Sequence, residues 1–166
     1  MPTKSQILTK NQILSGLVET RQNILAEASR LSDAEKDYIF LGIWSIKDLL
    51  AHLIGWDHTN LDAVKSVLEG KLPSFYEYRD HDWQTYNAIL IKKYKKDSFK
   101  ELLSTMKDSQ ENLIEFLRTI LPENFNKDVG LRFRGYKVTI QRLLEAEVKD
   151  EQTHLQQMTE FFKESK

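Results

Sequence analysis

The residues of this chain best suited to chemistry are two histidines and an aspartate in two distant segments. Asp150 and His154 are four residues apart, so on a helix they lie on one face, about one turn from each other. His52 lies far upstream, inside the strongly apolar segment 48–56. Imidazole nitrogens and carboxylate oxygens are common ligands of divalent metal ions. If the two segments meet in a helical bundle, these three side chains can supply three ligands for one ion.

Two glutamates lie on the same apolar stripe as His154. We interpret Glu151 as a hydrogen-bond acceptor for a ligating imidazole or as a catalytic general base. The alternative for Glu151 is a buried salt bridge, with Arg21 as its partner. Glu147 also intrudes into the stripe, and a buried carboxylate without a partner is unfavourable. Both glutamates therefore need either partners or a cavity.

Polar residues also intrude into the apolar face that accompanies His52. Asp57 and Asn60 lie within that stripe, and Trp56 follows His52 by one turn along its edge. Where polar groups intrude on two faces that meet, we expect a ligand pocket. Its predicted wall comprises Trp56, Asp57, Asn60, Asn87 and Glu147. The alternatives are structural hydrogen bonding for Asp57 and Asn87 and core packing for Trp56, whereas His58 lies on nearly the opposite face from His52 and is not a co-ligand.

Helical periodicity predicts four long helices and one shorter helix. Their expected ranges are about 5–31, 46–69, 80–95, 99–120 and 140–163. Capping boxes are expected at Thr3 with Gln6, at Ser45 with Asp48, and at Ser98 with Glu101. Residues 71–79 are predicted to be a loop, and a small hairpin around Gly135 interrupts an otherwise irregular stretch over 122–138.

These elements predict an all-α four-helix bundle, formed by residues 1–166 as a single domain. The connection over residues 70–98 is long and contains the short extra helix. Because a long crossover can join two parallel neighbours, the four helices need not alternate in direction.

Composition excludes several classes of function. The chain has 24 basic and 25 acidic residues, a net charge of −1, so no basic excess favours nucleic acid or an anionic membrane surface. We therefore expect neither a nucleic-acid partner nor a membrane partner. The chain has no cysteine, which excludes disulfides, thiolate ligands and a cysteine nucleophile and is compatible with the cytoplasmic location that we expect. A ferritin-like di-iron site is excluded because the pair Glu151-x-x-His154 has no second copy.

Two segments resemble the sequence signatures of the DinB/YfiT superfamily. Residues 44–57, WSIKDLLAHLIGWD, are similar to its second-helix signature, and residues 150–158, DEQTHLQQM, are similar to its last-helix motif. The resemblance extends over nearly the whole chain in helix order and loop length. The run Leu-Ile-Gly-Trp at residues 53–56 is most similar to the branch that includes DfsB-like and colibactin self-resistance proteins.

The resemblance implies a DinB-like four-helix bundle, often a homodimer, that binds one divalent metal ion through three histidines. His52 matches the first of these histidines and His154 the third, but Asp150 stands at the second position. Aspartate is a competent ligand for zinc, nickel, manganese or iron, and it lowers the net charge of the site by one. Loss of metal binding is the alternative, since the colibactin-resistance branch resembles this fold without relying on a metal triad.

Two functions from different classes follow from this resemblance. The first is a metal-dependent enzyme that transfers a low-molecular-weight thiol to a small electrophile, or hydrolyses the electrophile. The second is a metal-free bundle that binds or neutralises a small reactive compound in its core, with Trp44, Trp56, Trp83 and Tyr86 as pocket aromatics. Both imply a small-molecule partner, and a pure interaction module is a third option.

Overall fold

The computed structural model describes residues 9–32, 34–79, 83–96 and 98–164. Four long helices form a bundle, as predicted: α1 (Lys10–Ser29), α2 (Ile46–Leu68), α5 (Phe99–Arg118) and α7 (Ile140–Glu164). The smaller elements are a 3-10 turn η1 (Glu35–Asp37), the helices α3 (Tyr76–Arg79), α4 (Trp83–Tyr94) and α6 (Pro122–Phe125), and the strands β1 (Ile39–Leu41), β2 (Trp44–Ser45), β3 (Arg132–Phe133) and β4 (Tyr136–Lys137).

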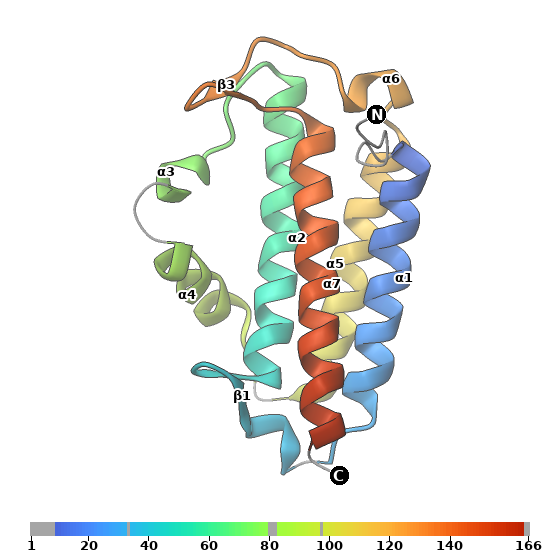
Figure 1. The fold of residues 1–166 in the computed structure, drawn as a ribbon, viewed down its shortest axis with the longest axis vertical. Coiled ribbons are helices and arrows are strands. Elements are labelled where there is room, and N and C mark those ends of the chain that lie inside the picture. The colour runs from blue at the N-terminus through green and yellow to red at the C-terminus, as the bar shows by residue number, and fades with distance from the viewer. Residues whose placement is uncertain (1–8, 33, 80–82, 97, 165–166) are drawn as a thin grey trace, which may run out of the picture.

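The four long helices do not alternate in direction. In Figure 1 the chain descends along α1, ascends along both α2 and α5, and descends again along α7. The long crossover through α3 and α4 therefore joins two parallel helices. In the bundle α2 packs mainly against α5, and α1 packs mainly against α7. The crossover helix α4 packs against α2 from outside the bundle.

Local capping interactions set where the helices begin. The Ser45 hydroxyl accepts a hydrogen bond from the Asp48 amide at 3.2 Å, and the Asp48 carboxylate accepts one from the Ser45 amide at 2.9 Å. This predicted box anchors the start of α2, seven residues before His52. At α1 the box is formed by Thr9 and Gln12. The box expected at Thr3 and Gln6 lies outside the described residues.

Two short hairpins flank the bundle, and only one of them was predicted. β3 and β4 form the hairpin expected around Gly135, where Arg134 and Gly135 have φ of 51° and 84° and so suit a two-residue turn. β1 and β2 form an unexpected hairpin, which brings the Trp44 ring over His52 with centroids 4.8 Å apart. The predicted loop over residues 71–79 contains the four-residue helix α3.

Close approach of α4 to α2 depends on a glycine. A Cβ atom built on Gly55 would lie 2.7 Å from the Leu90 Cβ, which is closer than van der Waals contact allows. Gly55 therefore lets α4 lie directly on α2. Within the described ranges, no helix has both the length and the apolar character needed to cross a bilayer.

Candidate metal centre and its cavity

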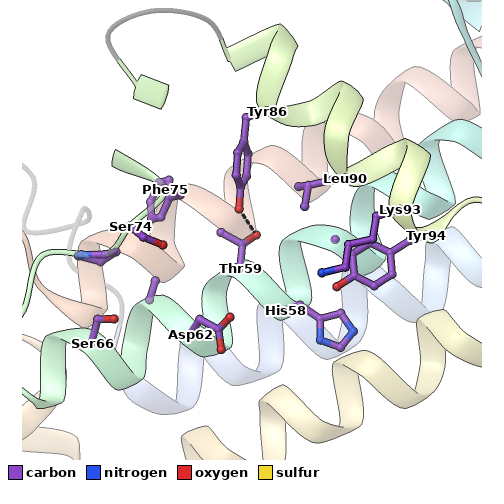
Figure 2. A pocket seen from close by; sticks show the side chains of 13 residues that line it. His58, Thr59, Asp62, Ser66, Ser74, Phe75, Tyr86, Leu90, Lys93 and Tyr94 are labelled. Carbon is purple, nitrogen blue, oxygen red and sulfur yellow. Dashed lines mark hydrogen bonds between the residues drawn. The ribbon is translucent and has the colours of Figure 1, made fainter. Parts of the chain in front are cut away.

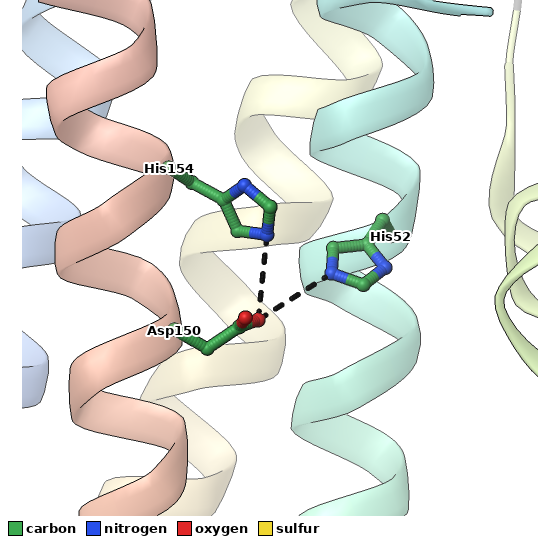
Figure 3. Close-up of side chains that lie close together, drawn as sticks. All are labelled: His52, Asp150 and His154. Carbon is green, nitrogen blue, oxygen red and sulfur yellow. Dashed lines mark ion pairs between the residues drawn. The ribbon is translucent and has the colours of Figure 1, made fainter. Parts of the chain in front are cut away.

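His52, Asp150 and His154 converge from two facing helices. Figure 3 shows the imidazole of His52 on α2 opposite the side chains of Asp150 and His154 on α7. The Asp150 Oδ2 atom lies 3.3 Å from His154 Nε2 and 3.7 Å from His52 Nε2. One ligand atom from each residue lies within 4.8 Å of the others, a spacing that one metal ion can bridge.

His52 is buried without hydrogen bonds. Its residue is 3% exposed, and neither ring nitrogen has a hydrogen-bond partner among the described residues. Burial lowers the pKa of His52, so its ring is neutral and one nitrogen carries a lone pair. Buried polar atoms are nearly always paired in native proteins. The unpaired ring of His52 is therefore accounted for if it coordinates an ion or a ligand.

His154 is oriented for coordination by a neighbour on its own helix. Its Nδ1 lies 2.9 Å from the Gln157 side-chain oxygen, which only accepts hydrogen bonds, so Nδ1 carries the proton. The other nitrogen, Nε2, faces Asp150 and keeps its lone pair in the neutral ring. Burial alone would lower the pKa of His154, but the hydrogen bond to Asp150 outweighs it and raises this pKa.

Asp150 completes the donor set as a carboxylate. Its side chain is half exposed, and its close contacts with His154 and His52 lower its pKa well below the usual range although partial burial opposes this. Two imidazoles and one carboxylate are a suitable ligand set for a divalent transition metal, which binds His154 in its neutral form. The residues present thus fit such an ion in chemical type, in spacing and in orientation.

The three residues line a cavity of about 520 Å³ between α2, the crossover and α7. The predicted pocket residues Trp56, Asn60, Asn87 and Glu147 also lie in its wall. Most of the remaining wall is aromatic: Trp44, Phe75, Tyr76, Trp83 and Tyr136. A cavity of this size with flat apolar walls and a few polar groups has the character of a small-molecule site.

A hydrogen bond between helices holds one wall of the cavity. The Trp56 indole nitrogen donates to the Asn87 side-chain oxygen at 2.9 Å, which ties α4 to α2. The Trp83 ring lies beside Trp56, with centroids 5.4 Å apart. Trp83 is only partly buried, so the crossover side of the cavity is closer to solvent than the bundle side.

Two polar atoms of the cavity wall are buried and unpaired. Glu147 and Asn60 are 5% and 2% exposed, and the Glu147 Oε1 and Asn60 Nδ2 atoms have no hydrogen-bond partner in the described part of the chain. Burial raises the pKa of Glu147 well above its ordinary value, and the nearby carboxylates of Glu151 and Asp150 raise it further. The Glu147 carboxyl is therefore readily held in its neutral form.

Asp57 and Glu151 belong to a different cluster, centred on Arg21 of α1. Arg21 Nε donates to Glu151 at 2.8 Å, and its two terminal nitrogens donate to the two Asp57 oxygens at 2.9 Å each. Ser109 of α5 donates to Asp57 as well. Both acidic side chains are buried away from the cavity wall. The prediction that Asp57 lines the cavity was therefore wrong. Glu151 makes the salt bridge with Arg21 that was the alternative to its interpretation as a catalytic base.

A second and smaller pocket lies on the other side of α4. It has a volume of about 120 Å³ and is lined by residues of α2, α4 and the segment between them, as Figure 2 shows. His58 stacks on Tyr94 here, with ring centroids 5.0 Å apart, and it does not join the three side chains of Figure 3. Tyr86, expected in the ligand cavity, instead lines this pocket and hydrogen-bonds to Thr59 at 2.6 Å.

Sequence reasoning missed three polar residues at the site. Gln157 orients His154, and Lys137 and Arg142 lie in the cavity wall. A signal for two of them was present. Gln157 follows His154 by three residues, which places the two side chains on one helical face. Arg142 precedes the wall residue Ala146 by four residues, so it also lies on the face of α7 that lines the cavity. Lys137 lies in β4, and helical spacing could not have found it.

Comparison with known proteins places this fold among described ones. Residues 17–158 match the model of the DinB superfamily. The structure of YfiT from Bacillus subtilis, described as a probable metal-dependent hydrolase with an unusual four-helix bundle topology, has a TM-score of 0.66 and 15% identity, over 99% of this chain and 93% of that one. A comparison with curated protein sequences found no match.

Two further solved structures are similar in fold. The colibactin self-resistance protein ClbS, solved in complex with double-stranded DNA, has a TM-score of 0.76 and 14% identity, over 93% of this chain and 96% of that one. DfsB, described as a sibling lethal factor precursor, has a TM-score of 0.75 and 15% identity, over 95% and 97%. At these identities the likeness concerns the fold, and the ClbS complex is a reason to test the expectation that this chain has no nucleic-acid partner.

Proposed function

This chain belongs to the DinB superfamily, and from that premise we propose that it binds one divalent metal ion through His52, Asp150 and His154 and acts on a small electrophile. The reaction that we propose is transfer of a low-molecular-weight thiol to the electrophile, or its hydrolysis. The observation that carries the proposal is the buried, unpaired imidazole of His52 within reach of the other two ligand atoms.

The charge of the buried groups supports a cation at this position. Asp57 and Glu151 share the single positive charge of Arg21, which leaves one negative charge, and ionised Asp150 adds a second. The carboxylate of Asp150 lies beside one nitrogen of each imidazole, so a cation would be favoured between these three ligand atoms.

Each part of the site has a role in the proposed reaction. A bound divalent ion would supply Lewis-acid polarisation of the electrophile. The aromatic wall formed by Trp44, Trp56 and Trp83 would pack against the apolar body of the substrate and limit access of water. Because the chain has no cysteine, a sulfur nucleophile must come from a separate small thiol that enters the same cavity.

Metal content of the purified protein is the first test. Protein prepared without a chelator or a histidine tag is analysed by mass spectrometry of metals, beside His154→Ala and, as a matched control, His58→Ala. We expect about one equivalent of a transition metal in the wild type and in the control, and none in His154→Ala. Absence of metal from the wild type, with no uptake of added zinc, nickel, manganese or iron, would overturn the proposal.

A metal-free binding function is the second candidate, and the size and aromatic wall of the cavity favour it. A bundle of this kind would bind or neutralise a reactive compound without help from an ion. The two candidates diverge at Asp150. Replacement of Asp150 with alanine should abolish metal uptake and catalysis in the first case, whereas it should leave binding of the compound intact in the second.

The expectations about partners remain proposals with direct tests. We propose a homodimer and no binding to nucleic acid. Light scattering coupled to size exclusion measures the first, since a dimer doubles the mass of 19.5 kDa. For the second, we expect no shift of a labelled DNA duplex at physiological salt, in keeping with a net charge of −1.

A further inference from the structure

Glu147 and Asn60 present opposite hydrogen-bonding atoms in one cavity. The unpaired atom of Glu147 is a carboxyl oxygen, which accepts, and the unpaired atom of Asn60 is an amide nitrogen, which donates. Glu147 lies on α7 one turn before Asp150, and Asn60 lies on α2 two turns after His52. The pair therefore lies on the same two helices as the three candidate metal ligands, displaced along the bundle in the same direction on both.

Among the described residues, one atom of each side chain is left without a hydrogen bond by the fold. Both are more than nine-tenths buried, where an unmade hydrogen bond is unfavourable. The Arg21 cluster shows that this bundle can satisfy buried carboxylates internally, because Asp57 accepts three hydrogen bonds from side chains there. Both residues line the cavity and their side chains are neighbours, yet their polar atoms lie farther apart than a hydrogen bond, so a molecule that enters the cavity could bridge them.

We propose that Asn60 and Glu147 form a subsite for a carboxamide-type group, one that carries an N–H donor beside a C=O acceptor. The ligand N–H would donate to Glu147 Oε1, and the ligand carbonyl would accept from Asn60 Nδ2. This inference deepens the function proposed above, because it names the substrate class of the same cavity and rests on that cavity being the substrate site.

The chemistry of the cavity disfavours the nearest alternatives. An ammonium group carries no acceptor for the Asn60 amide nitrogen. A carboxylate has no donor for Glu147. A carboxamide satisfies both atoms, and its planar shape suits a cavity walled by the flat rings of Trp56 and Trp83. The raised pKa of Glu147 agrees with a neutral ligand, since a neutral carboxyl does not need a cation as its partner.

The test uses benzamide as the probe, with N,N-dimethylbenzamide, methyl benzoate and benzoate as matched compounds. Binding is followed by ligand-observed NMR and by tryptophan fluorescence, on full-length protein stripped of metal and on protein loaded with zinc. We expect benzamide to bind at least about 10-fold more tightly than each of the other three, as expected for one lost hydrogen bond at a buried site. Equal affinity for benzamide and its dimethyl analogue, or no binding of benzamide, would overturn the proposal.

Isosteric variants assign the contacts. Asn60→Asp removes the donor and should weaken benzamide binding by about 10-fold, whereas Glu147→Gln keeps an acceptor and should retain most of the affinity. Asn112→Asp, at an exposed position on α5, makes the same chemical change outside the cavity and should have no effect. An Asn60→Asp protein that binds benzamide as tightly as the wild type would refute the assignment.

Metal content measured on the same samples separates the two proposals. Selective amide binding without metal uptake would overturn the metal-dependent function and support the subsite. Metal uptake without selectivity among the four probes would do the reverse.

Discussion

Two clusters of polar residues lie next to each other in this bundle. Two adjacent residues of α7 point into different clusters. Glu151 turns toward α1 and the Arg21 cluster, whereas Asp150 turns toward the cavity. In the Arg21 cluster, the guanidinium binds two carboxylates and the Met106 carbonyl. In the cavity wall, His52, Asn60 and Glu147 have buried atoms that find no partner among the described residues.

The difference distinguishes buried polar groups that hold the helices together from buried polar groups that are available to a ligand. Among the described residues, the buried side-chain atoms that lack a partner lie in the cavity wall with a single exception, the second oxygen of Glu151. On α1, Arg21 lies between Leu17 of one apolar cluster and Ile24 of the other, so its hydrogen bonds join all four long helices at the middle of the core. The Arg21 cluster, in which one oxygen alone lacks a partner among the described residues, stabilises the fold, whereas the unpaired atoms of the cavity wall indicate where a ligand binds.

The largest expected effect is loss of Arg21. Arg21→Met should lower the free energy of unfolding by about 3–5 kcal/mol, because it leaves Asp57 and Glu151 buried without a counter-charge. Urea unfolding followed by circular dichroism measures this. Arg30→Met is the matched control, since Arg30 is exposed and its contact with Glu27 is long, at 3.9 Å. A loss similar to that of the control would remove the distinction between the two clusters.

Gly55→Ala should have the next largest effect. The added methyl group would collide with Leu90 and move α4 away from α2, at a cost of about 1–3 kcal/mol for overpacking. Because α4 carries Trp83 and Asn87, tryptophan fluorescence of the cavity wall should change as well. Gly16→Ala is the comparison, since its methyl group would meet only Val148, at 3.2 Å. Equal stability of the two variants would contradict the tight contact between α4 and α2.

His52→Leu, unlike the two substitutions above, should not lower the free energy of unfolding of the metal-free protein. It replaces a buried unpaired imidazole with an apolar group, so the free energy of unfolding in a chelator should stay constant or rise by about 1 kcal/mol. Metal affinity should fall by at least about 100-fold, more than the loss of an outer-shell partner produces. A strong loss of stability without metal would place His52 with the structural cluster instead.

The smallest expected effect is the contribution of Glu147 to the pH dependence of the free energy of unfolding. Its folded pKa is raised, so the folded state retains a proton that the unfolded chain loses above its ordinary value of 4.5. The stability from this group is fully present below that pH and is lost as the pH rises toward the folded pKa. Glu147→Gln removes the titration, so its unfolding free energy should gain on that of the wild type as the pH rises above the ordinary glutamate value of 4.5. Parallel pH profiles of the two proteins would show that Glu147 titrates normally.

The sequence predicted the bundle well because helix signals are local. The capping box of Ser45 with Asp48, the stop at Gly70 and the hairpin at Gly135 depend on residues within a few positions of each other. The β1–β2 hairpin was missed because its strands have three and two residues, too short for an alternating pattern. The helix α3 was missed because its four residues are too few to show a helical repeat.

The site was harder to predict because a helical stripe has two sides. Periodicity places Asp57 and Asn60 on one apolar face of α2, but it does not say that Asp57 turns toward α1 and α5 while Asn60 turns toward α7. Only the packing of neighbouring helices decides this. The pairing of Arg21 with Glu151 could be foreseen, since a buried arginine needs an acidic partner.

The parallel arrangement of α2 and α5 has a consequence for how such proteins diversify. The crossover between them supplies one side of the cavity through Phe75, Trp83 and Asn87, and its helix α4 packs on α2 from outside the bundle. Substitutions of Trp83 and Asn87 can alter which compound fits while the contacts among the four long helices are kept. Proteins with this topology can therefore acquire new ligands through substitutions in the crossover alone. The contact between α4 and α2 must be kept for this, and it requires a glycine at position 55.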